Sequence, residues 1–460
     1  MLSGIKSAGR AALGAVAMAC AAAAVSAETL PGALADAYRN SQVLEQSRFL
    51  LRVDDENVTQ AVAQLFPVIN FTSTATRDLT NDTLTSTARL VADLAIYQGG
   101  QRRAGIAAAR ATVDAARQQL VNLEQQVLFD AAQAYLNVWR DAQIVAVRQS
   151  NVRVITQQLR AARDRFEVGE DTRTDVAQAE ANLAAARSNL AAAQGSLEIS
   201  RELFALVVGR YPGTITGPGQ LPHLPETEAA AEQLARQVHP AIRAIQAQVT
   251  AAEHSVEQAR GQGRPNLSLQ LSANETFQSP NPAQEGVNTQ LALTFTQPIY
   301  RGGQVASLER AAIAQVAAAR ANLSQQTLVN VQLVGNAYAQ LRIAGAQIQA
   351  SDQRIRAAQL AFDGVREEAA LGARTTLDVL DAEQDLLEAR ISRIEAQTAL
   401  HTAAYQVLQA SGLLTVTHLG LDVPEYDAEA YGAAFPAGVP RVLSPQGQRL
   451  DAVLERVGRD

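Results

Sequence analysis

The feature that most constrains the fold of this sequence is a duplication at a fixed spacing of 203 residues. The stretch from Val168 to Glu180 recurs from Leu371 to Glu383, with Gly, Thr, Asp, Val and Glu at matching positions. The turn that begins at Tyr97 is likewise matched by the turn at Tyr300. Agreement at one offset along most of both copies is the signature of an internal repeat. Each copy is therefore expected to contain the same elements in the same order.

The best-matched stretches lie between long alanine-rich runs that predict helices. Gly169 and Gly372 can end a helix in the left-handed conformation, and Thr172 and Thr375 can cap the helix that follows. The two stretches are therefore predicted to be the tight tips of two long helical hairpins.

Proline and alternating hydrophobic residues predict a pair of strands in each copy. A helix is expected from Leu30 to about Leu65, and Pro67 should stop it because proline lacks the amide donor. In the first copy, strands are predicted at about Val68 to Arg77 and Thr87 to Tyr97. In the second copy every second position is apolar, at Leu267, Leu269, Leu271, Leu291, Leu293 and Phe295. Strands of about ten residues can cross a membrane when tilted, but they equally fit an amphipathic hairpin in a soluble sheet.

The longest helices are predicted after each strand pair. The sequence from Gln101 to Val168 contains no proline, and a helix of that length would extend roughly 100 Å. The second copy repeats this pattern from Gln304 to Leu371, and its returning helix is expected from Leu377 to about Ala410. Apolar residues at steps of seven predict left-handed supercoiled packing, and one such series is Val145, Val152, Leu159 and Phe166.

Residues 1–27 have the character of a secretory signal peptide. A basic start at Lys6 and Arg10 precedes a short apolar segment, and a small-residue cleavage site ends at Ala27, directly before Glu28. A membrane anchor is the alternative interpretation, but the apolar run is short for a bilayer span. The segment is therefore expected to be removed from the mature chain.

Removal of the signal peptide would change both the cysteine content and the charge. Cys20 is the single cysteine, so no thiol chemistry is expected in the mature chain. Lipid modification of Cys20 is a lesser alternative, because the preceding residues 17–19 form a poor lipobox. The formal net charge would move from −7 to −9 because Lys6 and Arg10 would be lost. This acidic balance argues against nucleic acid as a partner.

The patterns divide the chain into five predicted parts. They are a signal peptide at 1–27, a first repeat at 28–210, a linker at 211–227, a second repeat at 228–414 and a C-terminal periplasmic tail at 415–460. In the tail, the segment from Leu450 to Val457 allows one short amphipathic helix. The sequence after the signal peptide lacks the apolar length of a transmembrane helix.

The order of helix, two strands, long helix, tip and returning helix, stated twice, resembles the TolC family of outer-membrane channel proteins. The resemblance extends from about Leu30 to Leu414, and it is carried by the turns at Tyr97 and Tyr300 and by the run from Gly372 to Asp381. It implies an α+β membrane protein with an internal two-fold sequence repeat. Three protomers would each give four strands to one outer-membrane β-barrel, continued by a long periplasmic α-helical coiled-coil tunnel. Because lipid cannot satisfy open strand edges, assembly as a homotrimer is expected to be obligate.

The resemblance places the pore constriction at Asp378 and Asp381. The two carboxylates are three residues apart, so they share one face of a helix. In a trimer each would form a ring of like charges that prefers cations. The alternative interpretation is that both are ordinary carboxylates at a helix start, where the helix dipole favours them.

Arg374 resembles the family's tip arginine, which holds the closed state through contacts with the first tip. Its expected partners are Asp175 and the adjacent Thr174, and the three residues form the predicted latch; a solvated loop cation is the alternative. The family has an aromatic residue where this chain has Ala369, so one latch contact is expected to be missing and the closed state to be held less tightly. The tips that meet a periplasmic adaptor protein would be shaped by Gly169, Thr172, Gly372 and Thr375, which are equally compatible with simple turns.

The sequence carries no motif of an enzyme. Its five histidines are scattered, and it contains no nucleophile motif, phosphate-binding loop or dinucleotide fingerprint, so neither a cofactor nor a metal is expected. The expected function is the exit duct of a tripartite export system, in type I protein secretion or small-molecule efflux. A periplasmic adaptor and an inner-membrane transporter, such as an ABC or RND pump, would open it. The protein would lie in the lipid of the outer membrane and extend into the periplasm. The alternatives are a periplasmic coiled-coil adaptor and a structural protein without a pore.

Overall fold

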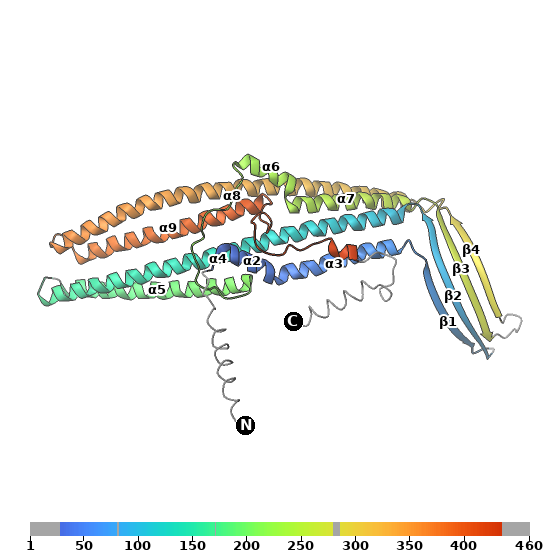
Figure 1. The fold of residues 1–460 in the computed structure, drawn as a ribbon, viewed down its shortest axis with the longest axis horizontal. Helices are drawn as coiled ribbons and strands as arrows, with labels where there is room; N and C mark the ends of the chain where they lie inside the picture. Colours follow the sequence, from blue (N-terminus) through green and yellow to red (C-terminus); the bar gives the residue numbers. More distant parts are fainter. Residues whose placement is uncertain (1–27, 81, 171, 279–285, 435–460) are drawn as a thin grey trace, which may run out of the picture. The chain divides into compact units, whose positions relative to one another are not determined.

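The structure is a computed structural model that describes residues 28–434, except for Asn81, Asp171 and 279–285. The predicted signal peptide at 1–27 and the predicted helix near Leu450 lie outside the described residues. Figure 1 labels the elements of the chain. They are α2 (Leu30–Asn40), α3 (Gln42–Ala63), β1 (Val68–Asp78), β2 (Thr83–Gln98), α4 (Gln101–Glu167), α5 (Arg173–Val208), α6 (Glu228–Val238), α7 (Pro240–Gly261), β3 (Asn266–Gln278), β4 (Gly286–Thr296), α8 (Gln304–Ala370), α9 (Thr376–Ala410) and α10 (Ala430–Ala434).

The order of these elements confirms the predicted repeat. Two helices, two strands, one very long helix and one returning helix occur twice, and the long helices α4 and α8 both contain 67 residues. The predicted bounds of α4, α8 and α9 agree with the structure to within a few residues. The bounds of α4 and α8 were predictable because local signals frame both helices, namely a glycine-rich turn at the start and a tip at the end, and α9 begins at such a tip.

The chain forms two compact units. Among the described residues, unit 1 comprises 28–42 together with those of 123–235 and 330–425, and unit 2 comprises those of 43–122, 236–329 and 426–434. Unit 1 contains the two hairpin tips, and unit 2 contains the strands. The helices α4 and α8 contribute residues to both units.

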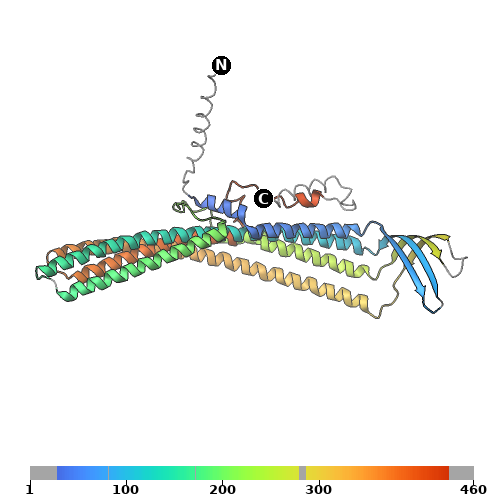
Figure 2. The same ribbon diagram turned by 90° about the horizontal axis from the view of Figure 1, so that it is seen from below.

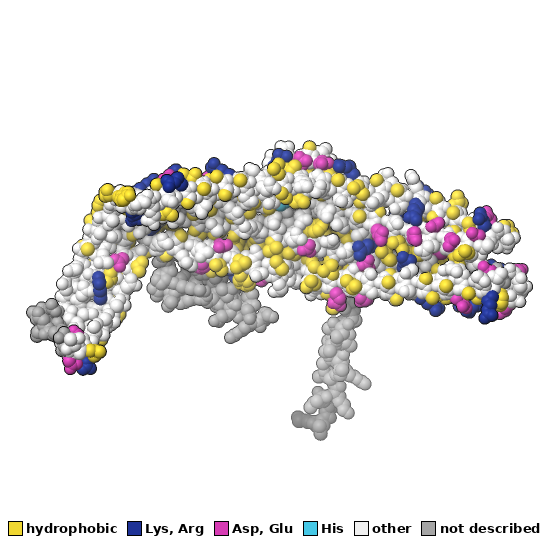
Figure 3. Space-filling view, turned by 180° about the vertical axis from the view of Figure 1, so that it is seen from behind, with side chains coloured by type: hydrophobic (Ala, Val, Ile, Leu, Met, Phe, Trp, Pro, Cys, Tyr) yellow, Lys and Arg dark blue, Asp and Glu magenta, His cyan; other side chains and the backbone are white. Residues whose placement is uncertain are grey.

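In unit 2 the strands form one antiparallel sheet in the order β1-β2-β3-β4. The central pair, β2 and β3, comes from different repeats, and Ala92 lies opposite Leu271 in its register. Every residue of the edge strands β1 and β4 is exposed in the protomer, including Phe71 at 71% and Phe295 at 66%. Figure 3 shows that charged side chains are sparse along the strands and gather near their far ends.

In unit 1 the helices α4 and α5 form one antiparallel hairpin, and α8 and α9 form another. Figures 1 and 2 show both tips at the same end of this unit. The heptad prediction is confirmed at Leu159 of α4, which packs with Ala179, Leu183 and Ala186 of α5. Leu380 of α9 completes this buried cluster. Small alanine side chains therefore let the two hairpins pack closely along their apolar seams. The heptad prediction is wrong for the last member of the predicted series, Phe166, which is 45% exposed in the protomer.

Two predicted boundaries are wrong. The helix predicted from Leu30 to about Leu65 is broken at Ser41, which has an extended backbone with φ −66° and ψ 109°. The side chain of Asn40 donates a 3.0 Å hydrogen bond to the carbonyl of Val208, which fixes the end of α2 against the end of α5. In addition, β2 begins at Thr83 rather than near Thr87, because polar residues at the hairpin end continue the ladder with β1.

Candidate functional site

The first tip is a left-handed turn followed by a capped helix. Gly169 has φ +85°, and a Cβ added there would have nothing within 4 Å, so backbone conformation rather than crowding favours glycine. Thr172 caps α5: its hydroxyl accepts from the amide of Asp175 at 3.3 Å. The Asp175 carboxylate in turn accepts from the amide of Thr172 at 2.9 Å and from its hydroxyl at 2.6 Å. The two residues thus form a capping box, as the predicted cap requires.

The second tip repeats this geometry. Gly372 has φ +77°, and the Thr375 hydroxyl accepts from the amide of Asp378 at 3.2 Å. The Asp378 carboxylate accepts from the amide and the hydroxyl of Thr375, both at 2.9 Å. The prediction that glycine ends one helix and threonine caps the next is therefore confirmed in both copies.

These hydrogen bonds keep both capping carboxylates charged. Hydrogen bonds from the side chain and backbone of Thr172 lower the pKa of Asp175. Those from the backbone and side chain of Thr375 lower the pKa of Asp378, with a smaller contribution from the charge of Arg374. Because the ionised form is the hydrogen-bonded form, both groups are anionic at neutral pH.

In this protomer, Arg374 pairs with Glu368 of its own hairpin. Its Nε donates to Glu368 Oε2 at 2.9 Å, and both side chains are about half exposed. Asp175, the partner predicted for Arg374, is engaged in its own capping box. Thr174 is exposed beside it. The structure thus places the three latch residues on the two neighbouring tips, and the latch contact itself stays a prediction.

A different arginine connects the two hairpins near their tips. Arg165, close to the end of α4, donates from Nη2 to the hydroxyl of Thr376 at the start of α9, at 2.7 Å. Position 165 is matched by Glu368 at the repeat spacing. Sequence reasoning missed Arg165, although this change of charge sign between equivalent positions was a signal that the two tips make different contacts.

The position where the family has an aromatic residue is occupied by a packed alanine. Ala369 is half-buried against the cluster of Phe362, Val379 and Leu386, which joins α8 to α9. Phe362, about two turns earlier on α8, supplies the aromatic side chain of this cluster. The hairpin therefore has an aromatic core near its tip even though Ala369 itself contributes only a methyl group.

The exposed face of α9 carries a stripe of carboxylates that begins with Asp378 and Asp381. Asp385 and Glu388 continue it at steps of four and three, so all four share one helix face. Asp381, Asp385 and Glu388 are exposed, and Asp378 is partly exposed. The first copy has Gln178 at the position equivalent to Asp381, so the stripe belongs to the second tip. Sequence reasoning identified only its first two members.

The opposite face of α9 buries one further carboxylate. Glu383 is 7% exposed, and Asn151 of α4, at 3%, donates to its Oε1 at 3.4 Å. Burial raises the pKa of Glu383 above its ordinary value, although the amide of Asn151 opposes this shift. The equivalent residue in the first copy, Glu180, instead forms an exposed ion pair with Arg163 at 2.5 Å. The contact between α4 and α9 therefore contains a carboxylate that is stabilised in its neutral form.

The tip residues can thus provide negative charge, caps and a contact between hairpins. Among the residues that the structure describes, no group of three or more His, Cys, Asp or Glu side chains is arranged to hold a metal ion. Within the same residues, none of the helices is both long and apolar enough to cross a bilayer.

Comparisons with known proteins agree with this architecture. The model of the family described as outer membrane efflux protein matches residues 33–210 and 232–413. Outer membrane efflux protein BepC of Brucella suis is 35% identical over 426 residues, which cover 92% of this chain and 93% of that protein. Protein CyaE of Bordetella pertussis is 30% identical over 339 residues, covering 72% of this chain and 71% of CyaE.

A solved structure supports the fold. The crystal structure of CusC superposes with a TM-score of 0.76 at 18% identity, covering 84% of this chain and 92% of CusC. The two matched regions of the family model also correspond to the two repeats. The chain belongs to the outer membrane efflux protein family.

Proposed function

We propose that the protein exports its cargo through a duct whose regulated entrance is formed by the two hairpin tips of each protomer. Family membership makes the protein an outer-membrane export channel that extends into the periplasm, with the fold of the TolC-like trimeric channels. The sheet is consistent with this role, because β1 and β4 are its edges and their apolar side chains are exposed. Lipid cannot satisfy the backbone groups of open edges. Three protomers that join their sheets edge to edge remove this cost.

The observation that carries the entrance proposal is the asymmetric pair of tips in unit 1. The second tip starts α9 with Asp378 and Asp381 on one exposed face, and the first tip is joined to it by Arg165. Repeated by three-fold symmetry, the two aspartates form adjacent rings of negative charge. Such rings prefer cations and repel one another when the entrance narrows.

The latch is the finer part of this proposal. Arg374 contacts Glu368 in the protomer. In the closed entrance, we propose that Arg374 instead contacts Asp175 and Thr174 of a first tip. The ion pair of Arg374 with Glu368 lies at the surface, and exchange of a surface ion pair changes the free energy little. Arg374 can therefore leave Glu368 without a large cost. An adaptor that docks on the tip turns at Gly169, Thr172, Gly372 and Thr375 then biases the entrance toward opening.

Family members work with adaptor proteins and inner-membrane transporters, and the present chain supplies the outer-membrane component of such a system. We assign the source of energy to the transporter, which would be of the ABC or RND type. The channel itself is passive, because the family consists of ducts rather than enzymes.

The test is ion selectivity in planar bilayers. Purified mature protein should conduct ions with a preference for cations, and the variant Asp378→Asn plus Asp381→Asn should lose most of that preference and of its block by multivalent cations. The matched control, Glu226→Gln plus Asp422→Asn, removes two exposed carboxylates from unit 1 outside the tips, and it should keep the wild-type preference. Equal selectivity of the tip variant and the wild type would remove the aspartates from the pore, and a lack of conductance under every condition would contradict the channel function.

A further inference from the structure

The first residue of the expected mature chain is buried in a polar cluster of unit 1. Glu28 is 6% exposed, and its backbone forms a parallel β-bridge with Ile215 of the linker between the repeats. The Glu28 amide nitrogen donates to the Thr214 carbonyl at 2.9 Å, and the Thr216 amide donates to the Glu28 carbonyl at 3.1 Å. A chain end held by backbone hydrogen bonds on both sides is not a fraying terminus.

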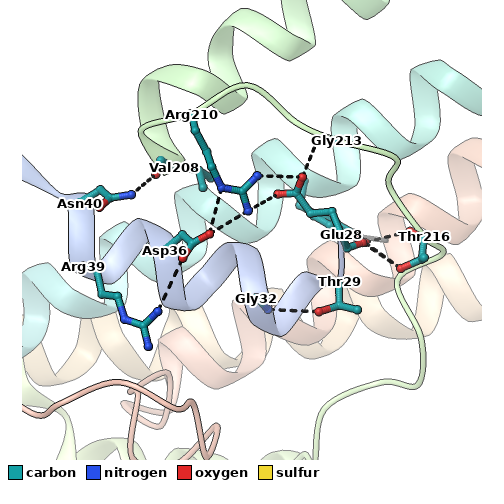
Figure 4. A network of polar contacts seen from close by, with 11 residues as sticks. Glu28, Thr29, Gly32, Asp36, Arg39, Asn40, Val208, Arg210, Gly213 and Thr216 are labelled. Atoms are coloured by element: carbon teal, nitrogen blue, oxygen red, sulfur yellow. Dashed lines mark hydrogen bonds and ion pairs between the residues drawn. The ribbon is translucent and has the colours of Figure 1, made fainter. Parts of the chain in front are cut away.

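Side chains complete this cluster, which Figure 4 shows. The fully buried hydroxyl of Tyr135 lies 2.8 Å from the Glu28 carbonyl oxygen and 2.9 Å from that of Thr216. Burial raises the pKa of Tyr135, so the hydroxyl keeps its proton and acts as a donor. The Thr216 hydroxyl donates to the Glu28 carbonyl as well, at 2.9 Å. We call the set of Glu28, Tyr135, Arg210, Gly213, Thr214 and Thr216 the N-terminal clamp.

The Glu28 carboxylate has one oxygen that lacks a hydrogen bond. Its Oε2 accepts from the amide of Gly213 at 2.7 Å and from Arg210 Nη1 at 3.1 Å. Its Oε1 is buried, lies 3.1 Å from Arg210 Nη2, and accepts no hydrogen bond. Arg210 also donates hydrogen bonds to Asp36 Oδ2, from Nε at 3.0 Å and from Nη2 at 2.7 Å. A buried carboxylate oxygen without a hydrogen bond is unfavourable. The carboxylates of Glu28 and Asp36 also share the single positive charge of Arg210. A further cationic donor would therefore stabilise the cluster.

We propose that the N-terminal clamp is a binding site for the α-ammonium group that signal-peptide cleavage creates on Glu28. This proposal rests on the predicted cleavage after Ala27 and not on the channel function. Cleavage converts the amide nitrogen of Glu28 into a cation with three donors. One N–H of this ammonium group keeps the hydrogen bond to the Thr214 carbonyl. Its other N–H groups can donate to the Glu28 carboxylate, and its positive charge offsets the negative charge there. The processed chain end thereby ties the start of α2 to α4, to the end of α5 and to the linker between the repeats.

The lysine content of the sequence allows this site to be probed selectively. Lys6 is the only lysine in the sequence, and it lies in the predicted signal peptide. The mature chain therefore has a single primary amine, the α-amino group of Glu28. An amine-reactive acetylating reagent, followed by measurement of the intact mass, reports on that one atom.

The experiment compares acetylation of the mature protein, purified from outer membranes in mild detergent, with that of the same protein unfolded in guanidinium. The mass should first show that the mature chain begins at Glu28. The folded protein should then be acetylated about tenfold more slowly than the unfolded chain or slower still, because reaction requires local opening of the clamp. A different first residue, or equal rates for the folded and unfolded chains, would overturn the proposal.

A matched pair of variants tests the clamp contacts themselves. Tyr135→Phe removes the hydroxyl from the Glu28 carbonyl, and it should raise the acetylation rate of the folded protein several-fold. Tyr338 is the equivalent residue of the second repeat, and its hydroxyl donates to the Pro225 carbonyl at 2.8 Å. Tyr338→Phe should therefore keep wild-type protection, and equal rates for the two variants would contradict the assignment. Bilayer conductance of the same preparations reports separately on the channel, so failure of the clamp and failure of the channel function are distinguishable.

Discussion

Arg165 and Thr376 join the two hairpins through a hydrogen bond of 2.7 Å from guanidinium to hydroxyl. The repeat equivalent of Arg165 is Glu368, which binds Arg374 within its own hairpin at 2.9 Å. Equivalent positions in the two copies therefore make different contacts. Arg165 of the first hairpin binds the second hairpin, whereas Glu368 binds a residue of its own hairpin. The pair of tips is therefore asymmetric, and the change of charge sign between Arg165 and Glu368 contributes to this difference.

Removal of this contact should loosen the entrance. Arg165→Ala deletes a partly buried hydrogen bond from a charged group, worth about 1.5 kcal/mol, so the ratio of open to closed channels should rise about tenfold. Single-channel recordings in planar bilayers measure this ratio directly. Arg163→Ala is the control, because Arg163 lies two residues away and pairs with Glu180 inside the first hairpin. An equal effect of both variants would assign the change to lost charge rather than to the contact between hairpins.

The charge of Asp378 should persist in mild acid. Hydrogen bonds from Thr375 lower the pKa of Asp378 below its ordinary value of 3.8, so the group is ionised above that pH and becomes neutral only as the pH falls through the lowered value. In the variant Asp381→Asn, the remaining cation preference should therefore be the same at pH 7 and pH 5 and disappear well below pH 4. Reversal potentials across a salt gradient give this preference. Its loss between pH 7 and pH 5 would show that another group supplies it.

The capping boxes should hold the first turns of the returning helices. Thr375→Ala removes the side-chain acceptor for the Asp378 amide and should destabilise the start of α9 by about 1 kcal/mol. Amide hydrogen exchange at residues 376–379 should then be roughly fivefold faster, whereas Thr375→Ser should restore the wild-type rate. Thr172→Ala is the matched change in the first copy, and it should speed exchange at the start of α5 only. Unchanged exchange in Thr375→Ala would mean that tertiary packing alone fixes this turn.

The buried carboxylate of Glu383 should make the trimer more stable in mild acid. Burial raises the pKa of Glu383 above 4.5 in the folded protein, so the folded state binds a proton more tightly than the unfolded chain. The stability of the contact between α4 and α9 therefore increases as the pH falls from above the raised pKa toward 4.5. Glu383→Gln keeps an acceptor for Asn151 without the charge, so it should raise the thermal transition at pH 7.5 and reduce its pH dependence.

The control for this prediction is Glu395→Gln, which neutralises an exposed carboxylate of the same helix. It should leave both the thermal transition and its pH dependence unchanged. A lower thermal transition for Glu383→Gln at pH 7.5 would contradict the role assigned to the buried carboxylate, because it would show that the ionised form stabilises the fold.

The repeat, the long helices and both tips could be predicted from sequence because their signals are local. Gly169 and Thr172 lie within one turn of chain, and the structure shows the left-handed glycine and the capping box that they imply. The family could also be recognised, since the tip motifs lie in a fixed order along nearly the whole chain.

The contacts between hairpins could not be predicted in this way. Arg165 and Thr376 are 211 residues apart, and Asn151 and Glu383 are 232 apart, so their contacts depend on how two finished hairpins pack. The break at Ser41 was missed for the same reason, because Asn40 is held by the carbonyl of Val208 at the end of α5. The predicted latch of Arg374 with Asp175 likewise depends on neighbouring tips in the assembled entrance.

The most direct test of the central claim, that three chains close one duct in the outer membrane, is the mass of the native protein. Mature protein should fractionate with outer membranes, and native mass spectrometry of the detergent extract should show three copies of the chain, because an isolated sheet leaves β1 and β4 as open edges in lipid. A water-soluble monomer that stays in the periplasmic fraction without detergent would contradict the account.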